Sequence, residues 1–165
     1  MPLTPAITDL EALKEHPAVA RLRGWNSAAV EAAKFDRDEM TIYVERSCIH
    51  DACVILRDDV TCPFNYLSDV TCVDWYPSQP RFEVVYQLLS IPNKERVRLK
   101  VRLSADSPVV ETVTSVWPSA NYFEREVFDL FGIRFTGHPY LRRIQMPEDW
   151  EGHPLRKDYP VEGYR

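Results

Sequence analysis

Residues 95–103 read Glu-Arg-Val-Arg-Leu-Lys-Val-Arg-Leu, an alternation of apolar and basic side chains. A period of two is typical of a β-strand that buries one face, because successive side chains point to opposite sides of a sheet. The inward side chains would be Val97, Leu99, Val101 and Leu103, and the cations would point outward. This stretch therefore predicts a strand in a sheet that is packed on one side.

Further segments with strand composition precede this strand. Residues 40–44, 64–75 and 82–89 are rich in β-branched and aromatic residues, and turn-like stretches such as residues 76–80 separate them. Helix-like segments accompany them. We therefore expect an α+β fold, with a single domain of a small, mostly antiparallel sheet and packed helices, followed by an extended C-terminal segment.

Two helices are predicted in the first half of the chain. Thr8-Asp9-Leu10-Glu11 has the composition of a capping box, which predicts a short helix that ends before Pro17. Ser47 is a candidate N-cap for a second helix, which would end near Asp58. The apolar stripe of this second helix would consist of Ile49, Ala52, Cys53 and Leu56.

A third helix is predicted from Asn121, a candidate N-cap to which Glu124 would reach back, to Gly132, which suits a left-handed C-terminal cap. The buried stripe would be Phe123, Val127, Leu130 and Phe131. The polar face presents Glu124, Arg125, Glu126 and Asp129. By itself such a face is typically solvated, and Arg125 and Asp129 have the spacing of an i, i+4 ion pair.

The composition changes after Gly132. Residues 133–165, called the tail below, contain four prolines and three glycines, so regular secondary structure is not expected. The tail is nevertheless too rich in large apolar side chains to be solvated: Ile133, Phe135, Tyr140, Leu141, Ile144, Met146, Trp150, Leu155, Tyr159 and Tyr164. We therefore divide the chain into an α+β domain, residues 1–132, and an extended partner-binding tail, residues 133–165. The tail would cover its own domain or, as its length favours, another subunit.

Composition excludes several classes of protein. The chain has 165 residues, 20 of them basic and 25 acidic, and its net charge of −5 argues against bulk binding to nucleic acid or anionic lipid. Its apolar runs, such as residues 53–56, are far below the roughly 18 residues of a membrane span, and its start lacks the features of a secretory signal. We therefore expect a cytoplasmic protein that reaches a membrane only through a partner.

Chemistry-bearing motifs are scarce. The four cysteines form no Cys-x-x-Cys pair, and no Gly-x-Ser-x-Gly elbow or phosphate-binding glycine loop occurs. His138-Pro139 and His153-Pro154 could suggest a metal site, but their spacing places no two ligands on one rigid face, which disfavours it. The basic face of residues 95–103 is a solvated face, a docking surface for an acidic partner or, least favoured because the strand shows no stacking aromatics, an RNA-binding face.

The motif Glu124-Arg125-Glu126-Val127-Phe128-Asp129-Leu130-Phe131-Gly132, followed by His138-Pro139 and Leu141-Arg142-Arg143-Ile144, closely resembles the family of the C subunit of the proton-translocating NADH:quinone oxidoreductase, respiratory complex I. The similarity continues from Met146 to Pro160, and Asp74 and Ser119-Ala120-Asn121 also resemble the family. Roughly residues 64 to 160 are covered. Gln145 departs from the family, in which an apolar residue usually occupies this position.

The resemblance implies a non-catalytic subunit of the peripheral arm, which docks on the quinone-binding D subunit and neighbouring subunits and supports electron transfer from NADH to quinone. It implies no cofactor in this chain, since iron–sulfur clusters, FMN and quinone belong to partner subunits. The location implied is the cytoplasmic side of the cell membrane, without direct insertion and without nucleic acid. The alternatives are the equivalent subunit of a membrane-bound hydrogenase or a ferredoxin:plastoquinone complex, and a stand-alone RNA- or metal-binding domain.

No catalytic, cofactor-binding or metal-binding residue is predicted. The predicted partner interface combines the polar face of the third helix with the tail motifs, and consists of Glu124, Arg125, Glu126, Asp129, His138, Pro139, Arg142, Arg143, Trp150, His153, Pro154, Arg156, Lys157, Asp158 and Tyr159.

Overall fold

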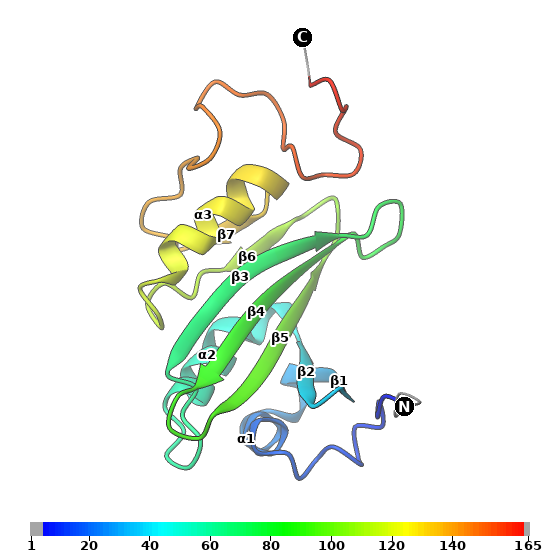
Figure 1. Ribbon diagram of the computed structural model, residues 1–165, viewed down its shortest axis with the longest axis vertical. Helices are drawn as coiled ribbons and strands as arrows, with labels where there is room; N and C mark the ends of the chain where they lie inside the picture. Colours follow the sequence, from blue (N-terminus) through cyan, green and yellow to red (C-terminus); the bar gives the residue numbers. More distant parts are fainter. Residues whose placement is uncertain (1–4, 164–165) are drawn as a thin grey trace.

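The main sheet of the protein has five strands in the order β1-β2-β5-β4-β3 (Figure 1). A computed structural model describes residues 5–163, so Tyr164 lies outside the described residues. The strands are β1 (Val30–Asp36), β2 (Glu39–Val44), β3 (Tyr66–Asp74), β4 (Phe82–Ser90) and β5 (Glu95–Leu103). Neighbouring strands are antiparallel except for β2 and β5, which are parallel. The sheet is therefore mixed and mostly antiparallel, as predicted.

Strand β5 lies at the centre of this sheet and has the orientation that its alternation predicts. Val97, Leu99, Val101 and Leu103 are all buried. Leu99 is paired with Ile42 of β2 on one side and with Tyr86 of β4 on the other, and both partners are buried. The apolar half of the alternation therefore forms the middle of the core.

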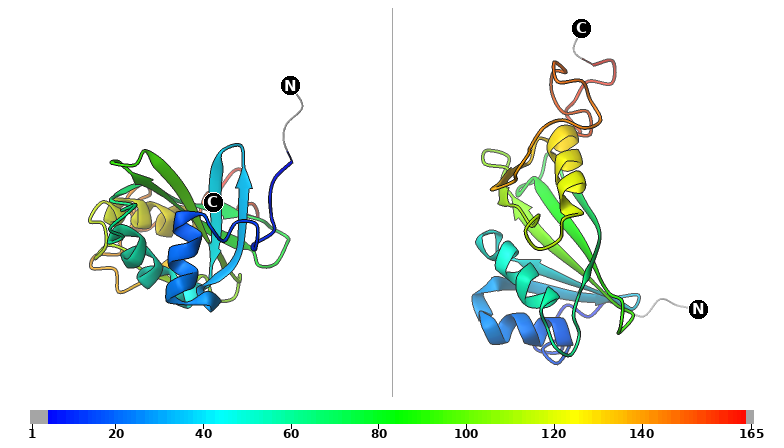
Figure 2. Two further views of the ribbon diagram at one scale, coloured as in Figure 1. Left: turned by 90° about the horizontal axis from the view of Figure 1, so that it is seen from below. Right: turned by 90° about the vertical axis from the view of Figure 1, so that its left-hand side faces the viewer.

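Within residues 5–163, three α-helices pack on this apolar face and leave the other face of the sheet uncovered (Figure 2). They are α1 (Pro17–Trp25), α2 (Ile49–Arg57) and α3 (Ala120–Phe131), and two 3-10 turns precede β1 and α2, η1 (Ser27–Ala29) and η2 (Arg46–Cys48). Each helix contributes buried apolar side chains to the same core cluster as the inward residues of the strands.

The start of the first helix was predicted wrongly. Residues 10–15 form turns, and α1 begins at Pro17, the residue that was expected to end a helix. Proline suits the first helical position because its fixed φ is already helical and its missing N–H has no partner there. The Asp9 carboxylate instead accepts a hydrogen bond of 3.0 Å from the backbone N–H of Glu11, which makes a local turn.

The second helix has the predicted apolar stripe but a different start. Ile49, Ala52, Cys53 and Leu56 are all buried, which confirms the stripe. Ser47, however, lies in η2, and its hydroxyl and N–H both donate to the Glu45 carboxylate. The N-cap is Cys48, without a side-chain capping bond.

The third helix begins two residues earlier than predicted. Its N-cap is Ser119, so the assignment of Asn121 as cap, with Glu124 reaching back to it, is wrong. Val127 and Phe131 are buried as predicted, whereas Phe123 and Leu130 are only partly buried. Gly132 has a φ of 75° and closes the helix in the left-handed conformation, as predicted.

A small second sheet joins the tail to the domain. Strand β6 (Val109–Glu111) pairs in parallel with β7 (Arg134–Thr136), so the tail contains one short strand where no regular structure was expected. From Gly137 to Gly163 the tail has turns and no helix or strand, and it passes the C-terminal end of α3 (orange to red in Figure 1). No helix within residues 5–163 is long and apolar enough to cross a lipid bilayer.

Candidate functional site

Asp129 lies on α3 and is fully buried, so the expectation of a solvated polar face is wrong for this residue. Its carboxylate accepts hydrogen bonds from the backbone N–H groups of Ile144, Gln145 and Met146 at 2.9, 2.7 and 2.9 Å, and from the Arg143 guanidinium at 2.6 Å. Burial alone would raise the pKa of Asp129, but these donors outweigh it and hold the pKa below its ordinary value. The ionised carboxylate thus fixes one turn of the tail.

Arg143 connects α3 to two later points of the tail. Besides the Asp129 carboxylate, its guanidinium donates to the carbonyl of Asp129 at 3.2 Å, and to the carbonyls of Trp150 and Gly152 at 2.9 and 3.1 Å. The planar guanidinium has enough donors to serve all of these acceptors at once. Arg143 therefore holds the tail in a loop over the last turns of α3.

Arg125, also on α3, binds the tail and not Asp129, so the predicted i, i+4 pair is wrong. Its guanidinium donates to the carbonyls of Arg142 and Arg143, both at 3.0 Å, and lies 5.4 Å from the centre of the Tyr140 ring. Glu126 is half-buried, and its carboxylate accepts a long bond of 3.4 Å from Gln145.

The last four carbonyl groups of α3 all have partners, although no further helical turn follows. The carbonyl of Phe128 accepts from the N–H of Gly132 at 2.9 Å, and that of Leu130 from the N–H of Leu155 at 3.0 Å. Those of Asp129 and Phe131 accept from the side chains of His153 and Arg156, at 2.9 and 2.6 Å. The tail thus supplies donors that a helix terminus otherwise takes from water, and the guanidinium groups of Arg143 and Arg156 lie at the negative end of the helix dipole.

Gly132 permits this capping. A Cβ atom at this position would overlap Nη2 of Arg156 and would lie 2.5 Å from Nε2 of His153. Its φ of 75° also disfavours residues with a Cβ. Both the backbone conformation and the close approach of the tail therefore require glycine.

A second ion-pair cluster fixes the end of the tail. Arg81, which follows the loop between β3 and β4, donates two hydrogen bonds of 2.9 Å to Asp74 and two, of 2.9 and 2.6 Å, to Asp158. The Asp74 carboxylate also accepts from the backbone N–H of Lys157 at 2.8 Å. Burial opposes ionisation of Asp74. The hydrogen bonds from Arg81 and from the backbone N–H groups of Lys157 and Tyr76 outweigh burial and lower its pKa to about 2.

Sequence reasoning did not include Arg81 and Asp74 in the site. Their positions gave one usable signal, because they flank the turn of residues 76–80, and opposite charges at the two ends of a hairpin loop face each other. Nothing in the sequence indicated that Asp158, 77 residues after Arg81, would complete the cluster.

Glu124 is fully buried, and its hydrogen-bond partners come from the segment after β6. Its carboxylate accepts hydrogen bonds from the Thr112 hydroxyl and from the backbone N–H of Val113. Burial raises the pKa of Glu124 to about 7, against these two bonds that lower it. His138 lies 4.0 Å away, and burial lowers its pKa, so the imidazole is neutral at pH 7.

The two histidine motifs occupy separate positions. Nδ1 of His138 accepts from the N–H of Tyr140 at 3.0 Å, which leaves Nε2–H to donate to the carbonyl of Asn121 at 3.3 Å. His153 instead caps Asp129. Among residues 5–163 no group of three or more His, Cys, Asp or Glu side chains is arranged to hold a metal ion.

The remaining predicted residues differ in exposure, and of these Lys157 and Asp158 also belong to the Arg81 cluster described above. Arg142 is exposed and pairs with Glu148 and the Tyr140 hydroxyl. Pro139, Lys157 and Asp158 are exposed, whereas Pro154 and Tyr159 are half-buried. Trp150 is 39% exposed. The assignment of these fifteen residues to a partner interface stays a prediction.

Large apolar side chains remain exposed around this end of the molecule. Tyr140 and Leu155 are each 51% exposed, and Ile144, Tyr122 and Val161 are exposed as well. Trp75 and Tyr76, on the loop that precedes Arg81, are about half exposed. This loop and the red part of the tail lie at the same end of the molecule (Figure 1).

Comparison with known proteins gives consistent matches over most of the chain. Residues 42–165 match the family described as respiratory-chain NADH dehydrogenase, 30 Kd subunit. The C subunit of the NADH-quinone oxidoreductase of Roseiflexus sp. (strain RS-1) is 48% identical over 150 residues, which are 91% of this chain and 86% of the relative. Its namesake from Geobacter metallireducens is 48% identical over 147 residues, 88% of this chain and 90% of the relative.

Two solved structures are also similar. A trypsin-resistant fragment of Nqo5 is 34% identical, with a TM-score of 0.53 over 62% of this chain and 83% of the fragment. A chain of the membrane-bound sulfane sulfur reductase, an archaeal respiratory membrane complex, is 26% identical, with a TM-score of 0.70 over 92% of this chain and 82% of the other.

Proposed function

The chain belongs to the family of the 30 kDa subunit of respiratory-chain NADH dehydrogenase, and from this premise we propose that it works as the C subunit of an NADH:quinone oxidoreductase, docking on the quinone-binding D subunit through α3 and the tail. In this role it holds parts of the peripheral arm together and so supports electron transfer from NADH to quinone. The resemblance noted in the sequence is confirmed at the level of the family.

One observation carries the proposal, namely that polar anchors fix the inner side of the tail after Gly137 while several large apolar side chains of the same segment remain exposed. Asp129, the carbonyls at the end of α3 and Arg81 bind the tail from within. Tyr140, Trp150 and Leu155 remain exposed on it. A contiguous exposed apolar surface with aromatic residues and a polar rim is typical of a protein–protein interface.

The proposal also assigns the chemistry to other subunits. In it this chain is non-catalytic and carries no redox centre, and the iron–sulfur clusters, FMN and quinone are held by its partners. The complex would sit on the cytoplasmic side of the cell membrane, with this chain peripheral to it. No nucleic acid and no lipid insertion is involved.

The identity of the parent complex rests on sequence identity. The relatives that are C subunits of NADH-quinone oxidoreductases are 44–49% identical to this chain, against 26% for the sulfane sulfur reductase chain. A complex of the hydrogenase-related type is therefore the alternative, and we propose the NADH:quinone oxidoreductase. The two are distinguished by the electron donor that the purified complex oxidises.

Co-purification with the D subunit tests the docking. We expect the double variant Trp150→Asp with Leu155→Asp to lose most of its binding, because two carboxylates would be buried without partners. The matched control, Val60→Asp with Ile91→Asp, changes two exposed apolar side chains at the opposite end of the sheet and should bind as the unchanged chain does. Equal binding by both variants would refute docking through the tail.

The isolated chain gives the second test. Its visible absorption should show no flavin or cluster, and it should not oxidise NADH. Turnover above background, or a bound chromophore that remains after gel filtration, would contradict the non-catalytic role.

A further inference from the structure

The face of the sheet opposite the helices, called the open face below, carries a row of cations along its central strand. The register places Arg96, Arg98, Lys100 and Arg102 of β5 on this face. The same register puts Glu39, Thr41 and Tyr43 of β2 and Glu83, Val85 and Gln87 of β4 beside them. No helix within residues 5–163 contributes to this side, because the apolar residues of all three pack on the other.

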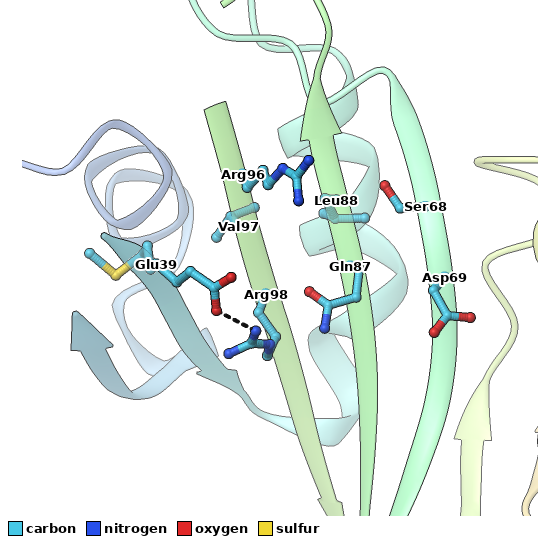
Figure 3. A pocket seen from close by; sticks show the side chains of 9 residues that line it. Glu39, Ser68, Asp69, Gln87, Leu88, Arg96, Val97 and Arg98 are labelled. Atoms are coloured by element: carbon cyan, nitrogen blue, oxygen red, sulfur yellow. Dashed lines mark hydrogen bonds and ion pairs between the residues drawn. The ribbon is translucent and has the colours of Figure 1, made fainter. Parts of the chain in front are cut away.

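The open face is hollowed along β5. One cavity, of about 250 Å³, is lined at the Arg96 end by Glu39, Ser68, Asp69 and Gln87 (Figure 3). A second, of about 410 Å³, lies beside Arg98 and Lys100 towards the β1–β2 hairpin. A third, of about 240 Å³, continues beside Arg102. The first and second cavities share Glu39 and Arg98, and the second and third share Tyr43, so the three hollows follow one another along β5 and are together called the groove below.

Charge on the open face is opposite in sign to that of the protein as a whole. Six cations face four carboxylates: Lys34 and Arg37 share Asp36, Arg98 pairs with Glu39, Lys100 and Arg102 share Glu83, and Asp69 lines the first cavity. Arg96 forms no ion pair with any residue from 5 to 163. Arg102 lies 4.0 Å from a carboxylate that Lys100 already holds at 2.7 Å. The open face as a whole thus has more cations than carboxylates, in a protein of net charge −5.

The spacing of these cations matches that of an extended polypeptide. Alternate residues of a strand are about 6.8 Å apart, so Arg96 and Arg102 are separated by roughly 20 Å. A partner segment in the extended conformation presents its own alternate side chains at the same interval. We propose that the open face is a docking surface for an extended acidic segment of a neighbouring protein, with carboxylates at alternate positions meeting the cations of β5.

The interleaved carboxylates favour a polypeptide over a nucleic acid. A nucleic acid carries a negative charge at every nucleotide, and Glu39 and Glu83 would repel it, whereas a peptide can present neutral side chains or backbone N–H groups to them. The aromatic platform that single strands need is also occupied, because Arg102 lies 4.2 Å over the ring of Tyr43. The sequence alone had not indicated that an aromatic side chain lies among these cations.

The concavity also disfavours a membrane surface. Lys100 and Arg98 are recessed, with 19% and 27% of their side chains exposed, and a flat layer of lipid headgroups would reach only the ends of the row. The inference uses the proposed function only in taking the neighbouring protein to be another subunit, and its test needs no partner subunit.

The probe is a synthetic nine-residue peptide of alternating glutamate and threonine, with a fluorescent label, whose binding to the full-length chain is followed by anisotropy. We expect binding that weakens with salt and that shifts the amide resonances of Thr41, Val85 and Lys100. A peptide of the same composition with its five glutamates in one block should bind at least about fivefold more weakly, because its charges match only one end of the groove.

Charge reversal identifies the surface. Arg96→Glu with Arg102→Glu should weaken binding of the alternating peptide by about tenfold or more, and the milder Arg96→Gln with Arg102→Gln should have an intermediate effect. The matched control is Arg46→Glu with Arg134→Glu, two exposed arginines that lie outside the groove, which changes the net charge equally and should leave binding within about twofold. Circular dichroism verifies that each variant is folded.

Three results would overturn the inference. They are an equal loss in the open-face and control variants, tighter binding of a nine-nucleotide oligothymidylate or of phosphatidylserine vesicles than of the peptide, and resonance shifts confined to the tail. The tail variants can be tested in the same way: if they no longer co-purify with the D subunit but still bind the peptide, the open face and the tail are two separate binding surfaces.

Discussion

Arg143 and Asp129 lie 14 residues apart in the sequence and are joined by a hydrogen bond of 2.6 Å, in which the guanidinium donates to a fully buried carboxylate. The same carboxylate receives three consecutive backbone N–H groups of the tail. The position of residues 143–146 therefore depends on one charge that belongs to the helix.

Arg143→Ala should lower the free energy of unfolding by about 2–3 kcal/mol, because it leaves Asp129 buried with the loss of its charged partner. Urea denaturation measures this, and hydrogen exchange should show faster exchange at Ile144, Gln145 and Met146. Arg142→Ala is the control, since an exposed pair with Glu148 contributes less than about 1 kcal/mol. An equal effect of both changes would contradict the role given to Asp129.

Gly132→Ala should destabilise the protein by about 2 kcal/mol or more, since alanine at positive φ is strained and its Cβ would collide with Arg156 and His153. Gly24→Ala provides the comparison. Gly24 lies in α1 with nothing within 4 Å of the added Cβ, so this change should stabilise by roughly 0.5–1 kcal/mol. Thermal unfolding of both variants checks this: the midpoint temperature should fall for Gly132→Ala and rise for Gly24→Ala.

Glu124→Gln should stabilise the protein at neutral and alkaline pH. The folded pKa of about 7 lies above the ordinary value of 4.5, so the folded state holds this proton more tightly. The wild-type protein therefore loses stability as the pH rises from about 4.5 through 7, and the neutral amide escapes this loss. We compare the free energy of unfolding of the variant with that of the wild type. The variant's advantage should be about 1–3 kcal/mol larger at pH 8 than at pH 5.

Urea midpoints measured at several pH values check this expectation. The difference in free energy of unfolding between Glu124→Gln and wild type should grow from pH 5 to pH 8. A difference that stays constant over this range would mean that the Glu124 carboxyl titrates near its ordinary pKa.

Arg81→Lys should loosen the end of the tail although it conserves the charge. The guanidinium binds two carboxylates through paired donors, and an ammonium group cannot reproduce both pairs, so we expect a loss of about 1–2 kcal/mol. Limited trypsin digestion should cut after Arg156 and Lys157 several times faster. Arg21→Lys, at an exposed pair with Asp59, should leave the cleavage rate unchanged.

The sequence predicted best those elements in which apolar periodicity decides the outcome. The alternation of residues 95–103 and the stripe of α2 correspond to buried faces, because nothing competes with burial of a regular apolar row. Helix starts were less predictable. The box of residues 8–11 and Ser47 both have the composition of caps, but in the structure the side chains of Asp9 and Ser47 make local turns instead.

The candidate site was harder to predict because it is held by hydrogen bonds and ion pairs between segments that are far apart in the sequence. Glu124 and Asp129 looked like a solvated face, since periodicity assigns only apolar side chains to the interior. Their donors come from Thr112 and from residues 143–146, and only the fold brings these segments together. The motif that resembles the family did mark most of the residues that join α3 to the tail, although its role in docking stays a prediction.

The anchoring of the tail to its own domain bears on how fast a complex can form. Fixing a mobile backbone costs roughly 1–2 kcal/mol per residue in conformational entropy, and a segment of this length would forfeit much of its contact energy on association. Here Asp129, the end of α3 and Arg81 have already ordered the chain up to Asp158. Its encounter with a partner is therefore expected to resemble the meeting of two preformed rigid surfaces, with a single bimolecular phase and no slow folding step.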